Sequence, residues 1–599
     1  MKSTALGVFS PANAPPIHPL AGDPSGRKPR VLLASAYGPY AVDDEESRKE
    51  NPMELYHNQV TREQGPFSLR MHHRSFGLML IQENIDAPCT LLDFPTLERF
   101  TDELRTIRYD IIGIGAIIPN LPKVAKMCAL IRRLQPHATI IVGGHVANHP
   151  GINELVDADH IARGEGVEFM RRFLGEDPSR PLRHPAVLSG LGAMTMGVPL
   201  GAGPKDTAAM VLCSVGCPMG CNFCATSAMF GGKGKMIHFF ETGDQLFELM
   251  CSLESKLGTQ SFFMMDENFL LHRKRALRLL ELMEQHDKPW ALYVFSSAHV
   301  ISKYTIDQIV RLGVSWVWMG LEGEDASYDK LKGIDVRALV RDLQDNGVRV
   351  LGSSIIGLET HTPENLARVI DYAAAYDTDF HQFMLYTPIP GTPLWREHKA
   401  KGDLLLDDEA KLADVHGQTR FNFHHQHIPA GAERELLRNA FRRDFELNGP
   451  SVLRIARTTL RGWVRHQHHE SARVRERFRR EAKDLALTYA GGLWAAARYF
   501  ARSNPHVAAR MTQILDELVR EYGMKTRVLA PLIGRYVLAK LRAEEVRMRE
   551  GPAWEPPTFY EKNAAAHAAG IVELRATSTA SARPRATEVG VPAAARVAT

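Results

Sequence analysis

The 599-residue sequence has few cysteines, no long apolar run and almost no surplus of charge of either sign. Seven cysteines are too few to cross-link a chain of this length, which excludes a disulfide-rich secreted scaffold. No stretch of about 18 residues is uniformly apolar, so no transmembrane helix is expected. The net charge of +4 gives no reason to expect that the whole chain binds nucleic acid.

The amino terminus also lacks the features of a secretory signal. Lys2 is followed by no apolar segment, and residues 1–28 are rich in proline. We therefore expect a cytoplasmic protein in which residues 1–28 and 571–599 are disordered tails. Hydrophobic residues make up 44% of the chain and charged residues 24%, which is ordinary for a globular protein with more than one core.

Residues 29–176 alternate short apolar runs with helical patterns, which is typical of a parallel sheet covered by helices on both faces. The third run ends in Gly143, Gly144 and His145, and ligands bind at such carboxyl ends of parallel strands. A long polar insertion at 40–75 follows the first run. The expected strands span 31–35, 110–116 and 139–142.

A second α/β region follows a linker at 177–207 and spans 208–400. Apolar runs separated by helical patterns and short loops predict a partial (β/α)6 barrel of parallel strands. From 401 to 570 the pattern is helical, so we predict an α/β protein with a helical carboxyl-terminal domain. The expected barrel strands span 208–212, 261–265, 291–295, 315–319, 349–356 and 380–386.

The cysteines provide the clearest chemical signal. Cys217, Cys221 and Cys224 are separated by three and two residues, directly after the first expected barrel strand. Three thiolates leave one iron of a 4Fe–4S cluster open for binding and catalysis. The alternative is a closed zinc site with Cys213 as the fourth ligand. Because a fourth thiolate would block the open iron, we interpret Cys213 as a residue of the strand.

This cysteine spacing resembles the signature of the radical S-adenosylmethionine (radical SAM) superfamily. Four further segments resemble strand motifs of that family, in the family's order, and the likeness covers about 208–400. It implies a 4Fe–4S cluster and S-adenosylmethionine as cofactors, with reductive cleavage to a 5′-deoxyadenosyl radical that abstracts hydrogen. The four segments are 262–269, Gly320-Leu-Glu322, 352–360 and 387–393.

The resemblance also implies roles for individual residues. Cys217, Cys221 and Cys224 would bind three irons, and S-adenosylmethionine would chelate the fourth. The carboxylates near the strand ends would meet methionyl or ribose groups, and the backbone of the fifth strand would approach the adenine. Each of these residues could instead satisfy its own loop, and no catalytic side chain is assigned. The implied cofactor-binding residues of the barrel are Asp266, Glu267, Glu322, Gly357 and Glu359.

The first α/β region resembles the cobalamin-binding domain that precedes the barrel in class B radical SAM enzymes. The likeness rests on residues 110–114, 142–145 and 159–168. A flat corrin would lie on the carboxyl edge of the sheet, with the insertion at 40–75 capping it or filling its space. The family's Asp-x-His-x-x-Gly motif is missing, which implies a corrin without a lower histidine. The implied corrin contacts are Gly143, Gly144, His145, Gly164, Glu165 and Gly166.

The helical pattern at 451–465 places four arginines on one stripe, at about 100° per residue, and apolar residues opposite. Such a helix packs its apolar face on the barrel with its arginines in solvent, or lies on an anionic membrane. The arginines are Arg454, Arg457, Arg461 and Arg465. A His-rich stretch at 421–427 is a weaker candidate for a second metal site or for lining the substrate cavity.

The resemblance implies a cobalamin-dependent C-methyltransferase that acts on an unactivated carbon of a hydrophobic, small-molecule or lipid-like substrate. A one-electron donor such as flavodoxin or ferredoxin is the implied partner, and peripheral membrane contact is a second expectation. One alternative is a non-methylating radical oxidoreductase or carbon–carbon coupling enzyme acting on a lipid. The other is a non-enzymatic corrinoid or iron–sulfur sensor, which would need no complete barrel.

Overall fold

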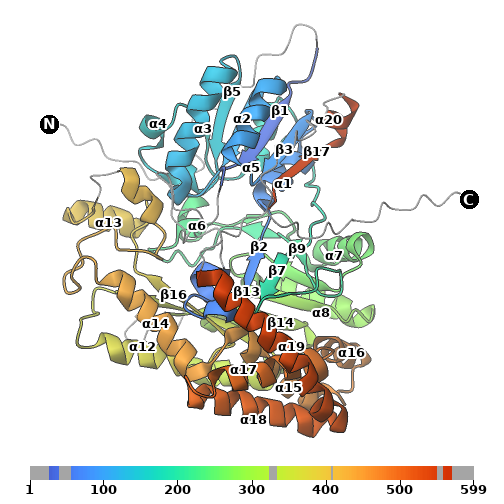
Figure 1. Cartoon of the computed structure of the whole chain (residues 1–599). Coiled ribbons are helices and arrows are strands. Elements are labelled where there is room, and N and C mark those ends of the chain that lie inside the picture. Colours follow the sequence, from blue (N-terminus) through green and yellow to red (C-terminus); the bar gives the residue numbers. More distant parts are fainter. Residues whose placement is uncertain (1–25, 39–55, 323–332, 406–408, 550–556, 570–599) are drawn as a thin grey trace, which may run out of the picture.

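The apolar runs of the first α/β region form a parallel sheet with helices on both faces (Figure 1). The computed structural model describes residues 26–38, 56–322, 333–405, 409–549 and 557–569. The expected strands are confirmed, and two more join them. In spatial order the parallel strands are β3 (Cys89–Asp93), β1 (Val31–Ser35), β4 (Ile111–Gly115), β5 (Thr139–Gly143) and β6 (His160–Ala162). The covering helices are α1 (Phe76–Asn84) and α5 (Gly166–Phe173) on one face, and α2 (Leu97–Thr106) and α3 (Leu121–Leu134) on the other.

A segment from near the end of the chain closes the edge of this sheet. β17 (Phe559–Lys562) pairs antiparallel with β3 and is followed by α20 (Ala564–Ala568). The Arg74 guanidinium ties the two strands together, since it bonds Asp93 at 2.8 Å and Glu561 at 2.8 Å. The sequence does not reveal this pairing, because a four-residue extended segment carries no periodic signal.

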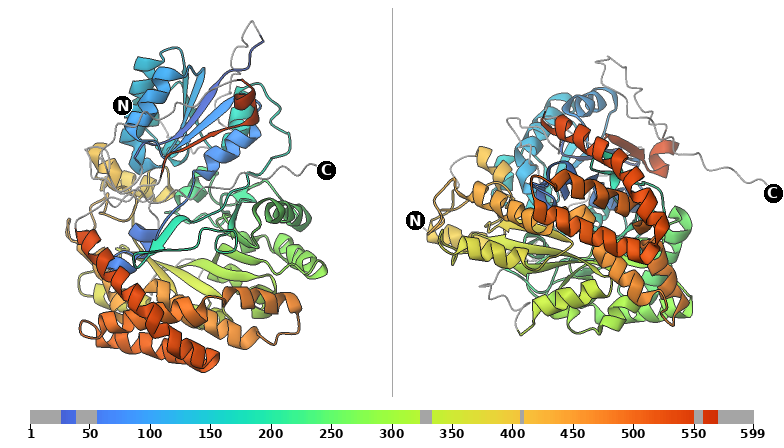
Figure 2. Two further views of the ribbon diagram at one scale, coloured as in Figure 1. Left: turned by 45° about the vertical axis from the view of Figure 1, so that its right-hand side comes forward. Right: turned by 60° about the horizontal axis from the view of Figure 1, so that its bottom comes forward.

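The second region is a six-stranded, fully parallel sheet that curves into a partial barrel (Figure 2). All six expected strands are confirmed within a few residues. Helices such as α7 (Gly243–Leu257), α8 (Arg273–Gln285) and α11 (Val336–Asp345) pack an apolar core on its outer face. In spatial order the strands are β16 (Phe380–Leu385), β15 (Arg349–Ile356), β14 (Val314–Glu322), β13 (Ala291–Ser297), β12 (Ser261–Met264) and β9 (Ala209–Val211).

The carboxyl-terminal helices lie on the side of the barrel away from the first domain (Figure 1). They share a core that includes Phe67 and Leu69 of the polar insertion. The described residues 56–75 of the insertion reach the barrel, and residues 40–55 lie outside the described part of the chain. The helices are α14 (Glu433–Asn448), α15 (Ser451–His466), α16 (Ala472–Glu481), α17 (Ala490–Phe500), α18 (Pro505–Tyr522) and α19 (Met524–Arg549).

Arg454 and Arg457 of the α15 stripe are turned toward the barrel, so the expectation of solvated arginines is wrong for these two, whereas Arg461 and Arg465 are exposed. Arg454 is fully buried and bonds Asp444 and the carbonyl of Thr378. Arg457 bonds Asp377 at 2.6 Å. Arg461 and Arg465 bond the carboxylate and the carbonyl of Asp345. The stripe thus holds the loops that precede β15 and β16.

No helix of the described residues is both long enough and apolar enough to cross a bilayer.

The buried pair predicts a large stability difference between two arginines of the same helix. Arg454→Ala leaves Asp444 buried without its partner, so we expect a loss of about 3–5 kcal/mol in the free energy of unfolding. Arg461→Ala removes a half-exposed ion pair and should cost less than about 1 kcal/mol. Denaturant unfolding monitored by circular dichroism measures both. Equal losses for the two variants would contradict the placement of the stripe.

Candidate functional site

The three clustered cysteines lie in one loop at the carboxyl end of the barrel. The loop begins after β10 (Ser214–Val215), which pairs antiparallel with β11 (Ile237–His238). The sulfur of Cys224 accepts from the backbone N–H of Ser227 at 3.4 Å and caps the short helix α6 (Ala225–Met229). The hydroxyl of Ser227 donates to the carbonyl of Cys217 at 2.8 Å. These bonds fold the loop so that all three thiols are partly exposed on it.

The three thiols are the residue type that holds iron–sulfur clusters. In the described part of the chain, no three His, Cys, Asp or Glu side chains are arranged to hold a metal ion, the His-rich stretch included. A 4Fe–4S cluster is held by several Cys thiolates, and its positive irons keep those thiols deprotonated. Without the cluster, burial raises the pKa of Cys217 and Cys224, and the neighbouring thiols add to the rise. Three thiols on one loop are the number that would leave one iron of such a cluster open, and their role as ligands stays a prediction.

Asp266 holds the approach to this loop in place. One of its oxygens accepts from the backbone N–H of Cys213 at 2.9 Å, and the other accepts from the hydroxyl of Ser214. The guanidinium of Arg275, from α8, pairs with the same carboxylate at 2.6 Å in a fully buried contact. Both oxygens of Asp266 are thus engaged inside the protein. The structure gives this predicted cofactor ligand a positioning role, and Arg275 is a partner that sequence reasoning missed.

Cys213 differs from the other three cysteines in its burial. Its side chain is fully buried in the core between the barrel sheet and the outer helices. Burial, together with the charge of Asp266, raises the pKa of its thiol well above the usual value. A buried thiol that resists deprotonation is a poor metal ligand. These properties agree with its interpretation as a strand residue.

Of the carboxylates predicted to bind a cofactor, Glu267 has a side-chain oxygen that is available to a ligand. It directly follows Asp266, and its Oε2 is buried without a hydrogen-bond partner. Burial, with a smaller contribution from the charge of Asp266, raises the pKa of Glu267 to about 8. At the end of the neighbouring strand β13, the hydroxyl of Ser297 is also buried without a partner. Two orphaned polar atoms at adjacent strand ends fit a polar ligand, and Ser297 is a candidate that the sequence analysis did not identify.

The other predicted residues of the barrel differ in their settings. Glu322 is buried at the end of β14 with φ at 58°, a left-handed conformation that is strained for a residue with a side chain. Gly357 follows β15, and its N–H donates to the ring of His361 at 3.0 Å, while the ring of Phe421 stands against its α-carbon. Glu359 is half exposed and pairs with Lys401 at 2.7 Å. It therefore lies on the surface.

The glycine-rich loop of the first domain reaches the cysteine loop. Gly144 has φ at 83°, and a Cβ there would lie 2.6 Å from the carbonyl oxygen of Ala116, so only glycine fits between β4 and β5. The following turn (His145–Asn148) contacts α6 of the cysteine loop. On its other side, Gly391 of the barrel packs so tightly that a Cβ would lie 2.7 Å from the carbonyl of Asn148. The carboxyl edges of the two sheets therefore face each other.

The residues of the second predicted corrin loop, Gly164 to Gly166, each have a structural role within the first domain. Glu165 caps α5, because its carboxylate accepts from the backbone N–H groups of Val167 at 2.7 Å and Glu168 at 2.6 Å. Gly166 packs against Ile81 of α1, and Gly164 adopts the left-handed turn before the cap. Gly143 ends β5 and packs against Ala162 of β6. Of the six predicted contacts, Gly144 and His145 are those that the structure places beside the cysteine helix.

An aromatic wall lines the inner face of the barrel below the cysteine loop. Phe295 stacks on Trp318 at 5.1 Å and contacts Phe263 at 5.7 Å between ring centres. The ring of His73, from the insertion, lies 5.9 Å from Phe263, and both of its nitrogens are buried without a partner. Burial lowers the pKa of His73 to about 4, so the ring is neutral. The sequence showed these strands but not which aromatic side chains converge.

A chain of hydrogen bonds runs from the aromatic wall to the insertion. The indole N–H of Trp318 donates to the hydroxyl of Ser353 at 2.8 Å, which donates to Gln382 at 2.7 Å. The amide of Gln382 in turn donates to Gln59 of the insertion at 3.0 Å. The insertion therefore forms part of the barrel interior, where it replaces missing strands.

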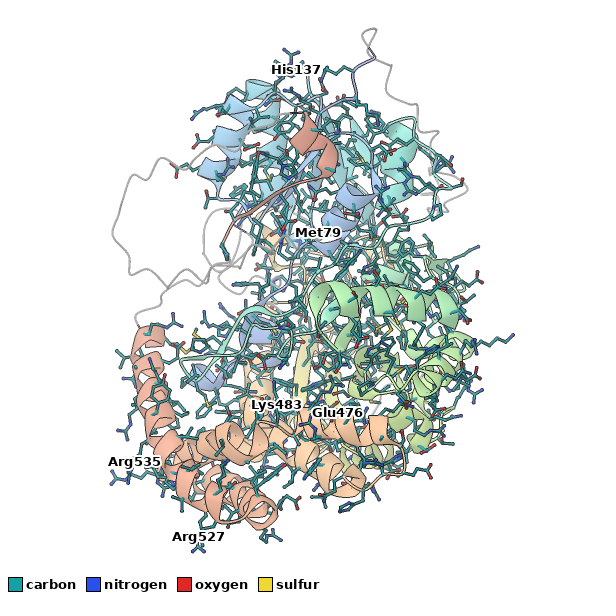
Figure 3. All side chains as sticks on the ribbon, turned by 90° about the vertical axis from the view of Figure 1, so that its right-hand side faces the viewer. Met79, His137, Glu476, Lys483, Arg527 and Arg535 are labelled. Carbon is teal, nitrogen blue, oxygen red and sulfur yellow. The ribbon has the colours of Figure 1, made fainter. Side chains whose placement is uncertain are left out.

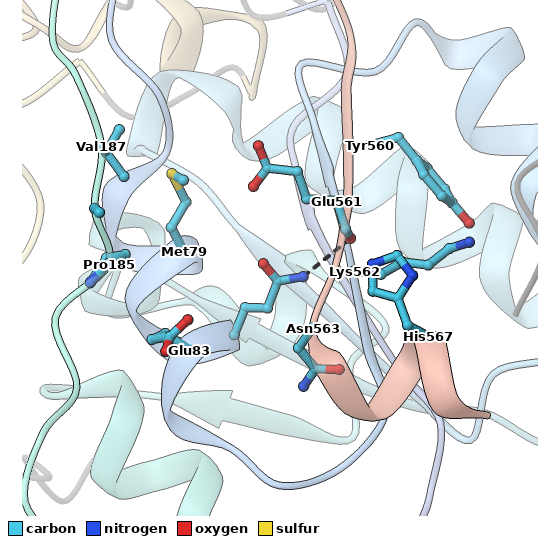
Figure 4. Close-up of a pocket in the computed structure, with 11 residues that line it drawn as sticks. Met79, Glu83, Pro185, Val187, Tyr560, Glu561, Lys562, Asn563 and His567 are labelled. Carbon is cyan, nitrogen blue, oxygen red and sulfur yellow. Dashed lines mark hydrogen bonds between the residues drawn. The ribbon is translucent and has the colours of Figure 1, made fainter. Parts of the chain in front are cut away.

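A separate cavity of about 460 Å³ lies at the edge of the first domain, between α1, β17 and α20 (Figure 4). Met79, Glu561 and His567 are among its lining residues, and Gln82 donates across it to the carbonyl of Glu561 at 3.1 Å. None of the residues predicted to bind a cofactor lines it.

Comparison with known proteins agrees with this site. Residues 211–373 match the model of the Radical SAM superfamily. An uncharacterized methyltransferase of Pyrococcus horikoshii is 26% identical over 337 residues, which cover 50% of this chain and 71% of the relative. Bacteriochlorophyllide d C-12(1)-methyltransferase of Chlorobaculum tepidum is 26% identical over 32% of this chain and 42% of its own length.

A solved structure gives a weaker likeness. The radical S-adenosylmethionine methyltransferase TsrM of Kitasatospora setae, with cobalamin and a [4Fe-4S] cluster bound, is 15% identical. The match covers 76% of this chain and 99% of that chain, with a TM-score of 0.46.

Four cysteine variants test the ligand set. Cys217→Ala, Cys221→Ala and Cys224→Ala should each remove the iron–sulfur absorbance and reduce bound iron and sulfide severalfold in anaerobically reconstituted protein, because each removes one of three thiolates. Cys213→Ala should retain iron, sulfide and absorbance. Loss of the cluster from Cys213→Ala at unchanged folding would contradict a three-cysteine site.

Proposed function

The chain contains a radical SAM domain at residues 211–373, and from this premise we propose that it is a cobalamin-dependent methyltransferase acting on an unactivated carbon of a hydrophobic substrate. The bound cluster would supply one electron for cleavage of S-adenosylmethionine to the hydrogen-abstracting radical, and cobalamin would supply the methyl group. Cys217, Cys221 and Cys224 would hold the cluster.

Two strand ends are the best candidates to hold S-adenosylmethionine. Glu267 offers a buried carboxylate oxygen that a cationic amino group would satisfy, and this pairing would return its pKa toward the usual range. Ser297 offers a hydroxyl on the neighbouring strand. Glu322, held in a strained conformation at the next strand end, is the candidate for a ribose hydroxyl. Asp266 would act indirectly, by holding the loop that presents Cys217.

The contact between the two domains is the observation that carries the proposal of methylation. The turn that follows Gly144 lies against α6, the helix that begins at the third cysteine. A corrin on the carboxyl edge of the first sheet would therefore stand beside the cluster, where hydrogen abstraction and methyl transfer share one substrate.

The aromatic wall supports a hydrophobic substrate. Phe263, Phe295 and Trp318 offer apolar ring faces, and the unpartnered nitrogens of His73 would bind one polar group of the substrate. The name of the Chlorobaculum relative states a bacteriochlorophyllide as its substrate. The electron would come from an external one-electron donor such as flavodoxin or ferredoxin.

Isotope transfer tests the proposed function. Reconstituted protein incubated with a low-potential reductant and S-adenosylmethionine that carries a deuterated methyl group should form 5′-deoxyadenosine and label the corrin, and then a hydrophobic acceptor, as mass spectrometry would show. Formation of 5′-deoxyadenosine by protein that retains no corrin would favour the non-methylating oxidoreductase or coupling enzyme instead. Absence of any cleavage with an intact cluster would leave the sensor as the better interpretation.

A glycine substitution tests the corrin edge separately. Gly144→Val should clash with the Ala116 backbone and lower corrin retention at least about tenfold after desalting, with iron content unchanged. Gly175→Asn is the matched control, because Gly175 also has a left-handed conformation but nothing lies within 4 Å of its added Cβ. Equal corrin retention in both variants would contradict the placement of the ring at this loop.

A further inference from the structure

The outer face of α19 is the most apolar exposed surface of the described residues. The described residues include seven exposed large hydrophobic side chains, and five of these belong to α19. Their exposed fractions lie between 55% and 67%. Four of them recur at every fourth position, so they form a stripe along the helix. The five are Met524, Val528, Leu532, Tyr536 and Val546.

This stripe cannot turn inward, because the opposite face of α19 is packed. Ala530, Gly534 and Val537 are buried against the neighbouring helices. A Cβ on Gly534 would lie 2.5 Å from the indole ring of Trp494, so α17 and α19 are in close contact. The helix is therefore fixed in rotation, and its apolar stripe is a constant feature of the surface.

Basic side chains flank and interrupt the same stripe. At about 100° per residue, Arg535 and Arg542 fall within the arc that the apolar stripe covers. Figure 3 shows Arg527 and Arg535 pointing away from the body of the protein. The exposed basic residues of the face are Lys525, Arg527, Arg535, Lys540 and Arg542.

No exposed acid offsets these charges on the described residues of the helix. Glu544 is buried and pairs with Arg547, and Glu545 is half buried and pairs with Arg549. None of the five exposed basic side chains forms an ion pair with another described residue. The face therefore combines exposed apolar groups with an uncompensated positive charge.

The groove beside α19 also combines apolar and basic side chains. A cavity of about 400 Å³ is lined by Arg527 and Pro531 of α19, by Trp494 of α17 and by Arg520 and Asp516 of α18. The guanidinium of Arg498 lies 3.4 Å from the centre of the Trp494 ring. Tryptophan and arginine are the side chains that favour the boundary between lipid headgroups and acyl chains.

We propose that the outer face of α19 docks the protein on an anionic lipid surface, with the apolar stripe at the level of the headgroups. The positive charge of the α19 face favours an anionic lipid surface over a second copy of the chain. A second copy of the chain would bring one basic face against another, which opposes self-association. An anionic bilayer complements both the charge and the apolar stripe, and a helix that lies in the interface needs no membrane-spanning segment. The proposal is independent of the proposed methylation, because α19 carries none of the cofactor residues.

Vesicle co-sedimentation of the full-length protein with its cluster tests the proposal. We expect binding to phosphatidylcholine vesicles that contain about 30% phosphatidylglycerol, little binding to pure phosphatidylcholine, and loss of binding at high salt, since the attraction is screened. Arg535→Gln/Arg542→Gln and, separately, Leu532→Ser/Tyr536→Ser should each weaken binding at least about tenfold. Iron content and melting temperature should remain those of the original protein.

Arg461→Gln/Arg465→Gln is the matched control, because these arginines lie on α15 and already bond Asp345. This variant should bind vesicles like the original protein. Equal loss of binding in the control and the α19 variants would overturn the proposal, and so would failure to bind anionic vesicles at low salt. Self-association that the α19 variants abolish, without vesicle binding, would assign the face to a second copy and overturn it as well.

Discussion

The buried carboxylate of Asp266 is the contact on which the geometry of the candidate site depends. It joins the end of β12 to the backbone of Cys213, to Ser214 and to Arg275 of α8. A buried ion pair of this kind is costly to break, because loss of one partner leaves an unpaired charge in the core. The three cysteines begin three residues after Ser214, so their loop starts from a point that this network holds. Asp266, which the sequence predicts as a cofactor ligand, therefore supports the cysteine loop from within the protein.

The two ends of the barrel have opposite electrostatic roles. At the amino ends of the strands, arginines pair with carboxylates, as Arg349 of β15 does with Glu481 of α16 and Arg454 of α15 with Asp444 of α14. At the carboxyl ends, polar atoms such as those of Glu267 and Ser297 are left without partners. Parallel strands place all their carboxyl ends at one edge, so stability and ligand binding are divided between the two ends. The arginine-rich carboxyl-terminal sequence is explained largely by this closure.

Among the described residues, α19 carries an exposed face that is both apolar and basic. A helix amphipathic in the ordinary sense turns its apolar residues inward. α19 buries Gly534 against α17 and Leu541 in the shared core, and it also leaves five large hydrophobic side chains exposed.

The sequence alone determined the local features. Apolar runs predicted every barrel strand, since a buried parallel strand needs continuous apolar residues. The spacing of Cys217, Cys221 and Cys224 predicted the ligand loop, because a short loop encodes its own ligand geometry. Only the tertiary structure decided which polar groups are used up inside the protein. Asp266 and Glu267 are adjacent in sequence, yet one is fully bonded and the other has an unpartnered oxygen. The same holds for the arginines of α15, for His73 in the barrel and for β17 on the first sheet. Their partners lie far away in the chain, so no local pattern could reveal them.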